Sequence, residues 1–401
     1  MKQTSTGRSA FRLACSIIAA STVMLASAQE VGMRAGGPSA QPAAAIASPL
    51  VASGRVTFNL RATEAKAVTV SGDFGPDVAL SRGADGVWTT TVGPLKPDEY
   101  VYYFTVDGVR LPDPVNPQVK IGYVNSTTTS IVNVPGDTPA FFDVQDVAHG
   151  EIRTLLYKSK SNNVVRELNV YLPPGYDANP RLRYPVLYLL HGFANDHHSW
   201  HRYGRANDIL DNLLATKSIR PFIVVMPLGY GGASVNGDGT GIPPANAGAF
   251  GGDFALYERD ILEDVIPLID GKYRTLANHD NRAIIGFSMG GMQAGRFGLG
   301  HLDTFSYVGI MSAGLLGNPA SAAAGPDPIA AMAANPAAAN KQIKLLWIAC
   351  GVSDTAMAGA RTTHEALQKA GIKHTFVESE GAHHWRVWRG YLRDVAPLLF
   401  R

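Results

Sequence analysis

The sequence predicts an all-β part followed by an α/β part whose sheet is mostly parallel. Up to about residue 136, short segments alternate apolar and polar residues and are separated by Asp-Gly pairs. From about residue 140, short apolar runs ending in Gly or Pro alternate with helix-like stretches. A period of two is typical of half-buried antiparallel strands, and continuous apolar runs are typical of parallel strands covered on both faces.

The length and charge of the chain limit the choice of function. With 401 residues, 46% of them hydrophobic, the chain is long enough for two domains with their own cores. Its formal net charge is +2, and no block of like charges occurs. A balance of this kind gives no basis for a nucleic-acid partner, so we expect none.

Residues 1–28 are predicted to be a signal peptide. A basic start precedes a mainly apolar stretch from Leu13 to Leu25, and Ala26-Ser27-Ala28 fits a small-x-small cleavage site. The apolar stretch is too short to span a bilayer comfortably. We therefore expect a secreted or periplasmic protein with no membrane segment in its mature form; an uncleaved N-terminal anchor is the alternative.

Two segments follow the predicted signal. Residues 29–49 are rich in Ala, Gly, Ser and Pro and predict a flexible lead-in. Residues 50–136 contain six or seven short alternating segments with Asp-Gly turns. This number of strands in so short a stretch predicts a small β-sandwich of the immunoglobulin-like type.

Residues 140–401 are predicted to form the α/β domain. Its first two segments, 152–159 and 166–176, are expected to extend the sheet antiparallel. The apolar runs that follow are "PVLYLLHG", "FIVVMPLG", "AIIGFS", "YVGIMSAG", "KLLWIACG" and "HTFVESEG". Helix-like stretches such as 258–273 and 360–371 lie between them. Functional groups in such a sheet belong at the carboxyl ends of the strands.

The pentapeptide "GFSMG", Gly286 to Gly290, has the pattern Gly-x-Ser-x-Gly. A buried-strand pattern precedes it and a plausible helix follows, which is the setting of a nucleophile elbow. In that interpretation Ser288 occupies a strained turn, and the Met289 N–H faces a developing oxyanion. The alternative is the glycine-rich start of an ordinary helix.

A nucleophilic serine needs a base and an acid that orients the base, here expected in the order Ser, Asp, His. Asp354 follows one apolar run, and His383 and His384 follow the next. Two alternatives stay open for the acid. Asp354 could instead cap the helix that comes after it, and Glu378 and Glu380 are rival carboxylates.

The second oxyanion donor is expected from the loop after an early strand. "LYLLHGFAND" supplies this loop, with Phe193 as the donor and His191 as a residue that fixes the loop by hydrogen bonds. We assign substrate binding to Gly192, Tyr230 and Trp385. The long glycine-rich run from Gly229 to Asp253 is interpreted as a substrate-binding loop.

His197, His198 and His201 are the one histidine cluster that raises the question of a metal. No cysteine accompanies them, and apart from nearby Asp196 no carboxylate has recognisable ligand spacing. We expect no metal site and no cofactor.

From about Ile152 to its end, the chain resembles the family 1 carbohydrate esterases, which include feruloyl and acetylxylan esterases and are related to enterochelin esterases. The blocks that carry the resemblance are "LYLLHGF", "GRANDILDNLLA", "RPFIVVMP", "NRAIIGFSMGGMQAGRFGLGHLDTFSYVG" and "GAHHWRVWRGYLRDVAPLLF". The resemblance implies an α/β-hydrolase fold and a serine esterase.

Carried over by position, the resemblance implies roles for five residues. Ser288 matches the family nucleophile and Asp354 the acid. The family pattern Gly-x-His-x-(Trp or Phe) aligns with "GAHHW", which makes His383 the base. Phe193 and Met289 match the oxyanion amides.

The first domain resembles the early-set sandwiches related to carbohydrate-binding module family 48. "VSGDFG", "DGVWTTTVGPL" and "YYFTVDG" carry this likeness. It implies a glycan contact by the N-terminal domain, for which Trp88, Tyr100, Tyr102 and Tyr103 are the candidate stacking residues. Because alternate residues of a strand face the core, at least some of the four are expected to be packing residues instead.

The expected function is that of a secreted serine ester hydrolase that removes feruloyl or acetyl groups from plant cell-wall polysaccharide, as in xylan degradation. Its partner would be an ester-bearing small molecule or polysaccharide. The alternatives are a siderophore esterase or an acyltransferase on the same scaffold, and a non-catalytic glycan-binding protein.

Overall fold

The computed structural model describes residues 46–122, 128–235, 241–242, 253–316 and 327–401. The predicted signal peptide and most of the predicted lead-in lie outside these residues. So does the larger part of the predicted loop from Gly229 to Asp253.

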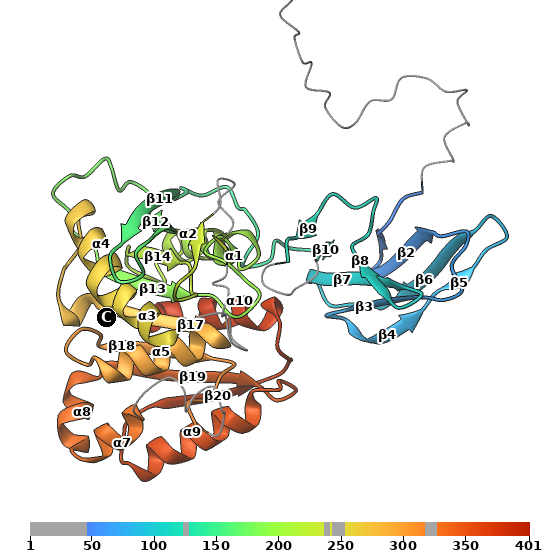
Figure 1. The fold of residues 1–401 in the computed structure, drawn as a ribbon. Coiled ribbons are helices and arrows are strands. Elements are labelled where there is room, and N and C mark those ends of the chain that lie inside the picture. The colour runs from blue at the N-terminus through green and yellow to red at the C-terminus, as the bar shows by residue number, and fades with distance from the viewer. Residues whose placement is uncertain (1–45, 123–127, 236–240, 243–252, 317–326) are drawn as a thin grey trace, which may run out of the picture. The chain divides into compact units, whose positions relative to one another are not determined.

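Two antiparallel sheets make up the first part of the described chain (Figure 1). One has the order β1-β2-β6-β5, and the other has the order β4-β3-β7-β10-β9 with β8 paired to β7. The strands are β1 (Leu50–Ala52), β2 (Arg55–Arg61), β3 (Val68–Gly72), β4 (Gly75–Ala79), β5 (Ser81–Arg82), β6 (Val87–Val92), β7 (Asp98–Val106), β8 (Val109–Leu111), β9 (Val119–Lys120) and β10 (Thr129–Val134). Their inward-facing residues share one hydrophobic core, because alternate side chains of each strand point to the same side. The immunoglobulin-like classification stays a prediction.

This core takes in most of the aromatic residues proposed for glycan stacking. Trp88, Tyr100 and Tyr102 are buried in it. Tyr103 is half-buried, and the Arg110 guanidinium lies 4.9 Å from the centre of its ring. Three of the four candidates are therefore packing residues, so the structure shows no aromatic platform made of them.

A single eight-stranded sheet organises the second part, in the order β11-β12-β14-β13-β17-β18-β19-β20. From β14 to β20 neighbouring strands are parallel, whereas β11 and β12 are antiparallel at one edge, as predicted. The strands are β11 (Glu151–Ser159), β12 (Val164–Leu172), β13 (Val186–Leu190), β14 (Ile223–Pro227), β17 (Arg282–Phe287), β18 (Tyr307–Met311), β19 (Leu345–Gly351) and β20 (Thr375–Ser379). A separate hairpin pairs β15 (Ser234–Val235) with β16 (Gly241–Ile242).

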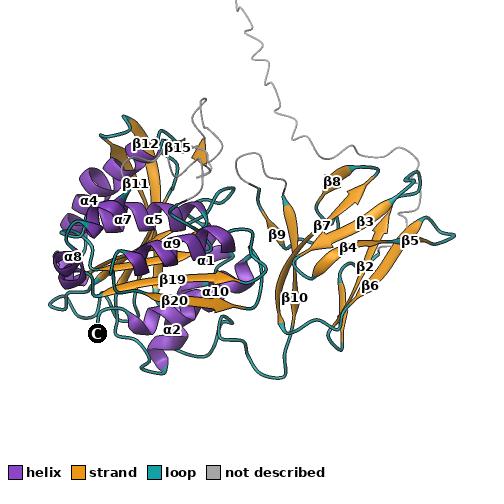
Figure 2. Ribbon diagram, turned by 90° about the horizontal axis from the view of Figure 1, so that it is seen from below, coloured by secondary structure: helices purple, strands orange, loops and turns teal. Residues whose placement is uncertain are grey.

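Helices cover both faces of this sheet (Figures 1 and 2). One face carries α3 (Phe254–Arg259), the π-helical η1 (Asp260–Val265), α4 (Ile266–Lys272), α5 (Met289–Gly300), α7 (Pro328–Ala333), α8 (Pro336–Gln342) and α9 (Met357–Lys369). The other carries α1 (Ser199–Arg202), α2 (Ala206–Ala215), α10 (Trp385–Val395) and the 3₁₀ turn η3 (Ala396–Leu398). A further 3₁₀ turn, η2 (His279–Asn281), precedes β17. The predicted α/β organisation is confirmed.

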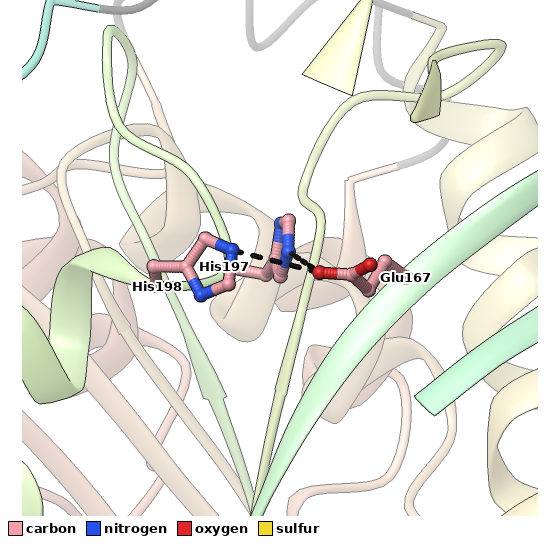
Figure 3. A group of neighbouring side chains, drawn as sticks. All are labelled: Glu167, His197 and His198. Atoms are coloured by element: carbon pink, nitrogen blue, oxygen red, sulfur yellow. Dashed lines mark hydrogen bonds and ion pairs between the residues drawn. The ribbon is translucent and has the colours of Figure 1, made fainter. Parts of the chain in front are cut away.

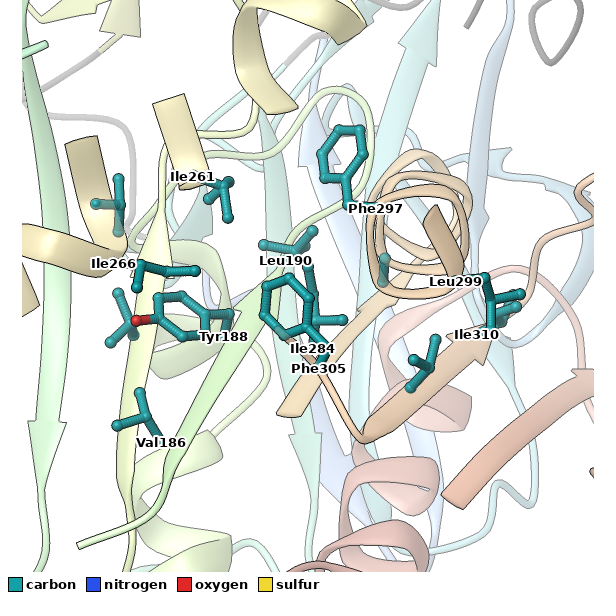
Figure 4. Packing of buried hydrophobic residues seen from close by; sticks show 14 of the residues in the cluster. Val186, Tyr188, Leu190, Ile261, Ile266, Ile284, Phe297, Leu299, Phe305 and Ile310 are labelled. Atoms are coloured by element: carbon teal, nitrogen blue, oxygen red, sulfur yellow. The ribbon is translucent and has the colours of Figure 1, made fainter. Parts of the chain in front are cut away.

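The larger core lies between the sheet and α3 to α5 (Figure 4). Side chains of the central strands, among them Tyr188, Ile284 and Ile310, face Ile261 of η1 and Phe297 of α5. These strands are apolar along most of their length because both of their faces are covered. Among the described residues, we find no helix that is long and apolar enough to cross a membrane.

Candidate active site

Ser288 lies in a sharp turn between β17 and α5. Its backbone has φ 54° and ψ −121°, a combination that a residue with a side chain rarely adopts. A Cβ on Gly286 would lie 2.3 Å from the Gly290 carbonyl oxygen, and one on Gly290 would lie 2.4 Å from the His191 oxygen. Glycine is therefore required at both positions, because strand, turn and helix pass too close for any side chain.

Three side chains from different strand ends meet at this turn. The Ser288 hydroxyl donates to His383 Nε2 over 2.8 Å. His383 Nδ1–H donates to Asp354, with distances of 2.9 Å to Oδ1 and 3.1 Å to Oδ2. Since the carboxylate accepts at Nδ1, the neutral ring presents its Nε2 lone pair to the serine. This is the arrangement that activates a hydroxyl for nucleophilic attack.

The surroundings keep Asp354 ionised. Its side chain is 0% exposed, whereas that of His383 is 32% exposed. Burial acts to raise the pKa of Asp354, but hydrogen bonds from the His383 imidazole, the Ala356 N–H and the Ser312 hydroxyl together lower it. The site thus holds a stable negative charge behind a partly open imidazole.

The alternatives raised for the acid have other contacts. Asp354 Oδ1 does accept from the Ala356 N–H at 2.8 Å, but it bonds His383 at the same time. Glu378 pairs with Arg361 of α9 through two hydrogen bonds of 2.7 and 2.9 Å. The Glu380 side chain is 92% exposed. Of these carboxylates, the structure brings Asp354 to the histidine.

The loop after β13 lies directly against the serine. A Cβ on Gly192 would lie 3.1 Å from Ser288 Cβ, so the backbone of residues 192 and 193 passes beside the nucleophile. His191 holds this loop: its Nδ1–H donates to the Gly192 oxygen at 2.8 Å, and its Nε2 accepts from the Gly229 N–H at 2.8 Å. The predicted structural role of His191 is confirmed. Met289 is the first residue of α5, on the other side of Ser288.

The residues assigned to substrate binding differ in exposure. Gly192 borders Ser288. Tyr230 is 0% exposed and donates through its hydroxyl to the Asn195 oxygen at 2.9 Å. Trp385 is 3% exposed and packs against the rings of Trp200 and Phe287. Tyr230 and Trp385 therefore support the walls of the site from behind.

Ser312 and Trp388 support the acid from behind, and the role of Ser312 had no signal in the sequence. Trp388 Nε1–H donates to Ser312 Oγ at 2.9 Å, and the Ser312 hydroxyl in turn helps to lower the pKa of Asp354. The Trp388 ring also meets the His383 ring edge-on, with centres 5.1 Å apart. Ser312 follows β18 in the run "MSAG", and only its positive φ of 49° marks it as special.

Two of the three clustered histidines approach a carboxylate on β12. His197 Nε2 lies 2.7 Å and His198 Nε2 3.5 Å from Glu167 Oε1 (Figure 3). With Glu167 they form a group whose ligand atoms lie within 4.8 Å of one another. Glu167 could not be recognised as part of this group from the sequence, because it lies 30 residues before His197 in the chain.

The hydrogen bonds of Glu167, His197 and His198 favour a role in holding the loop after β13 in place over a role in binding a metal ion. The Asn169 amide donates from Nδ2 to the His197 oxygen and to His198 Nδ1, each at 2.9 Å. His198 therefore carries its proton on Nε2, which faces Glu167. A metal-ligating histidine instead has its second nitrogen protonated and donating to an acceptor. Burial lowers the pKa of both histidines to about 4, so both rings are neutral donors.

The fold and the site together define a protein of the α/β-hydrolase class, with a serine elbow and a Ser-His-Asp hydrogen-bond chain at the carboxyl edge of the sheet. Residues 159–399, more than half of the chain, match the family described as "Putative esterase". The chain therefore belongs to this esterase family, and the expected family is confirmed.

A known protein resembles most of this chain in sequence. The chain is 33% identical over 366 residues to the "Endo-1,4-beta-xylanase/feruloyl esterase" of Xylanibacter ruminicola, a match covering 88% of this chain and 46% of that protein. The chain thus spans about half the length of this relative.

Solved structures show the same fold. A ferulic acid esterase superposes with a TM-score of 0.54 at 26% identity, over 62% of this chain and 97% of that one. The enterobactin esterase FES of Shigella flexneri superposes with a TM-score of 0.63 at 17% identity, over 86% of this chain and 92% of that one. At that identity, the second likeness concerns the fold alone.

Proposed function

We propose that the protein is a serine carboxylic-ester hydrolase that removes feruloyl or acetyl groups from plant cell-wall polysaccharide. The observation that carries this proposal is the continuous hydrogen-bond chain from Ser288 through His383 to Asp354. The relative named as a xylanase and feruloyl esterase supports the choice of substrate.

In the proposed mechanism, Ser288 Oγ attacks the ester carbonyl carbon while His383 Nε2 takes the hydroxyl proton. Asp354 orients the imidazole and stabilises its positive charge. The tetrahedral intermediate collapses as His383 returns the proton to the leaving alcohol, which leaves an acyl-serine. Water, activated by His383, then attacks this ester and releases the carboxylic acid.

The charge on the tetrahedral oxygen needs donors that are in place before the reaction. We assign this role to the Phe193 and Met289 amides, which come from the two segments that border Ser288. Gly192 would let the substrate approach closely, and the segment from Gly229 onward would contact the acyl group. We further propose export through residues 1–28.

Replacing Ser288 by Ala tests the catalytic assignment. Because the acyl-enzyme cannot form, kcat on p-nitrophenyl acetate is expected to fall by about 10⁶, as in other serine hydrolases. Labelling by a fluorophosphonate should also disappear, with the folded structure unchanged by circular dichroism. An S288A variant that keeps substantial turnover would refute the assignment.

Substrate class is tested separately on the wild-type protein. The values of kcat/KM on methyl ferulate, acetylated xylan and p-nitrophenyl acetate are compared under the same conditions. Preference for methyl ferulate or acetylated xylan supports a polysaccharide esterase. Transfer of the acyl group to an added sugar acceptor would indicate an acyltransferase, and preference for a catecholate trilactone would indicate a siderophore esterase.

A further inference from the structure

Strand β12 carries two adjacent charged residues in a position where buried strands are usually apolar. Arg166 is 0% exposed and Glu167 is 7% exposed. Consecutive residues of a strand point to opposite faces, so the two side chains enter opposite layers of the domain. Burying a charge is costly unless it is paired and hydrogen-bonded, so a pair of this kind needs an explanation.

The register of β12 explains where these side chains act. The pairing of β12 with β14 ends at Leu168 and Pro227. Beyond this point the chain leaves the sheet as residues 228–233, opposite Arg166 and Glu167. Pairing with β12 no longer holds this part of the chain. Among the described residues, one backbone hydrogen bond from another segment reaches it, from the Asp253 N–H to the Gly231 oxygen at 3.4 Å, and side chains make its other hydrogen bonds to the rest of the domain.

Arg166 binds the departing segment through its carbonyl groups. Its Nη1 donates to the oxygens of Tyr230 at 2.8 Å and Ala233 at 2.7 Å, and its Nη2 donates to the Leu228 oxygen. Its Nε forms an ion pair with Asp260 of the π-helical turn at 3.1 Å. Only the planar, five-donor guanidinium can serve three carbonyls and a carboxylate at once.

The segment held by Arg166 packs on both residues proposed as oxyanion donors. Leu228, Tyr230 and Ala233 form a small hydrophobic cluster with Met289, and Phe193 packs against it. Gly229 of the same segment donates to His191 and accepts from Gln293 Nε2 at 2.9 Å.

Glu167 lies on the opposite face of β12 and binds the loop after β13, which carries Phe193. It accepts from His197 Nε2 at 2.7 Å, and His197 lies four residues after Phe193. Its neighbour Asn169, two residues along the same face, donates to the His197 backbone oxygen. The loop that carries Phe193 is thus tied to the strand that also holds residues 228–233.

We propose that Arg166 and Glu167 are a pair of positioning residues that hold the two loops flanking the oxyanion site from opposite faces of β12. The inference rests on the proposed function, because it assigns the pair to the preorganisation of that site. Neither residue contacts the triad in the part of the chain that the structure describes.

The first test replaces Arg166 by Lys, which keeps the charge near Asp260 but lacks the planar set of donors. We expect kcat on p-nitrophenyl acetate to fall between about 10-fold and 100-fold, the range for a small misplacement of a catalytic geometry, with KM nearly unchanged. Affinity for phenylboronic acid, whose serine adduct is tetrahedral like the intermediate, should fall by a similar factor.

Arg282→Lys is the matched control. Arg282 is also a buried arginine in this sheet, paired with Asp270 at 2.8 Å, but it lies at the end of β17 farthest from Ser288. R282K should lower stability and leave boronate affinity unchanged. Equal losses of boronate affinity in the two variants, or wild-type values in R166K, would overturn the proposal for Arg166.

The second test compares Glu167→Gln with Glu167→Leu. Glutamine keeps an oxygen that accepts from His197, so E167Q should retain wild-type kcat and boronate affinity. In E167L, kcat and boronate affinity should fall by a similar factor. Equal behaviour of the two variants contradicts an anchoring role. The anchoring role would also be contradicted if one zinc ion bound per chain and if a chelator removed the activity and zinc restored it. Glu167, His197 and His198 would then form a metal centre.

Amide hydrogen exchange tests the proposal on the wild-type protein, without any substitution. Amides of residues 229–233 should be protected as strongly as those of β14; exchange at the rate of an open loop would overturn the proposal even if every variant misfolds. This measurement also separates the two proposals. If S288A stays active, the proposed function fails, while protected loops would still show that the pair holds them.

Discussion

Single residues at the site combine features that rarely occur together. Ser288 adopts a positive-φ backbone conformation that costs free energy, and two glycines that no other residue could replace flank its turn. Asp354 is a buried carboxylate, and hydrogen bonds from its neighbours nonetheless lower its pKa. Such perturbed residues mark functional sites, because the rest of the fold must stabilise them.

Substitutions of the two adjacent histidines, His383 and His384, are expected to differ in their effect on kcat. His383 bonds both Ser288 and Asp354, whereas His384 is the N-cap residue of α10 and its Nδ1 has no hydrogen-bond partner among the described residues. His383→Ala should lower kcat on p-nitrophenyl acetate by about 10⁶, as much as loss of the nucleophile. His384→Ala should lower it less than tenfold; equal losses would contradict the assignment of the base.

Asp354→Asn should lower kcat by about 10⁴. The asparagine amide can still accept from Ala356, but toward His383 it offers a donor and therefore selects the imidazole tautomer that cannot accept the serine proton. Turnover of p-nitrophenyl acetate near pH 8 measures the effect. Glu378→Gln is the control and should keep wild-type kcat, since Glu378 pairs with Arg361 on the surface.

At the level of elements, the close approach of α5 to β13 and β17 positions the serine. The first turn of α5 touches the backbone at the end of β13, and Gly291 and Gly295 bring the helix near β18. These contacts let the helix start directly behind Ser288. The N-terminal end of a helix carries partial positive charge, which suits a site where an oxyanion develops.

Gly290→Ala should destabilise the fold by about 1–3 kcal/mol, because the new methyl group would meet backbone atoms that cannot move aside. The nearest are the oxygens of His191 at 2.4 Å and Leu190 at 2.7 Å. Urea unfolding measures the change. Gly390→Ala in α10 is the matched control: a Cβ at this position would have no atom within 4 Å, and the substitution should stabilise by about 0.5–1 kcal/mol. If both substitutions changed the free energy of unfolding in the same direction, this account would be contradicted.

Across the whole molecule, buried and half-buried neutral histidines link stability to pH. Burial is the largest cause that lowers the pKa of His191, His197, His198 and His201, in each case to about 4. In the unfolded chain the same groups titrate near about 6.5. Between these values the unfolded state binds more protons than the folded state, so acid favours unfolding.

The free energy of unfolding should therefore fall as the pH decreases from about 6.5 to about 4, by up to about 1.36 kcal/mol per pH unit for each such histidine. Urea unfolding at a series of pH values measures the slope. His201→Gln removes one of these groups and should flatten the curve in this window while leaving stability above pH 7 nearly unchanged. A pH-independent stability in the same window would contradict the prediction.

The sequence by itself determined the order of the strands along the chain, the elbow and the identities of Ser288, Asp354 and His383 as candidates. These features are local: apolar runs, glycine spacing and positions just after strands can be read along the chain. Family resemblance then narrowed the choice between His383 and His384, which spacing alone left open.

Only the tertiary structure decided which contacts form between distant segments. It separated Asp354 from Glu378, placed Tyr230 and Trp385 in the core, and brought Glu167 to His197. It also revealed the carbonyl contacts of Arg166. None of these follows from periodicity, because a buried side chain finds its partner through the pairing and packing of elements that lie far apart in the chain.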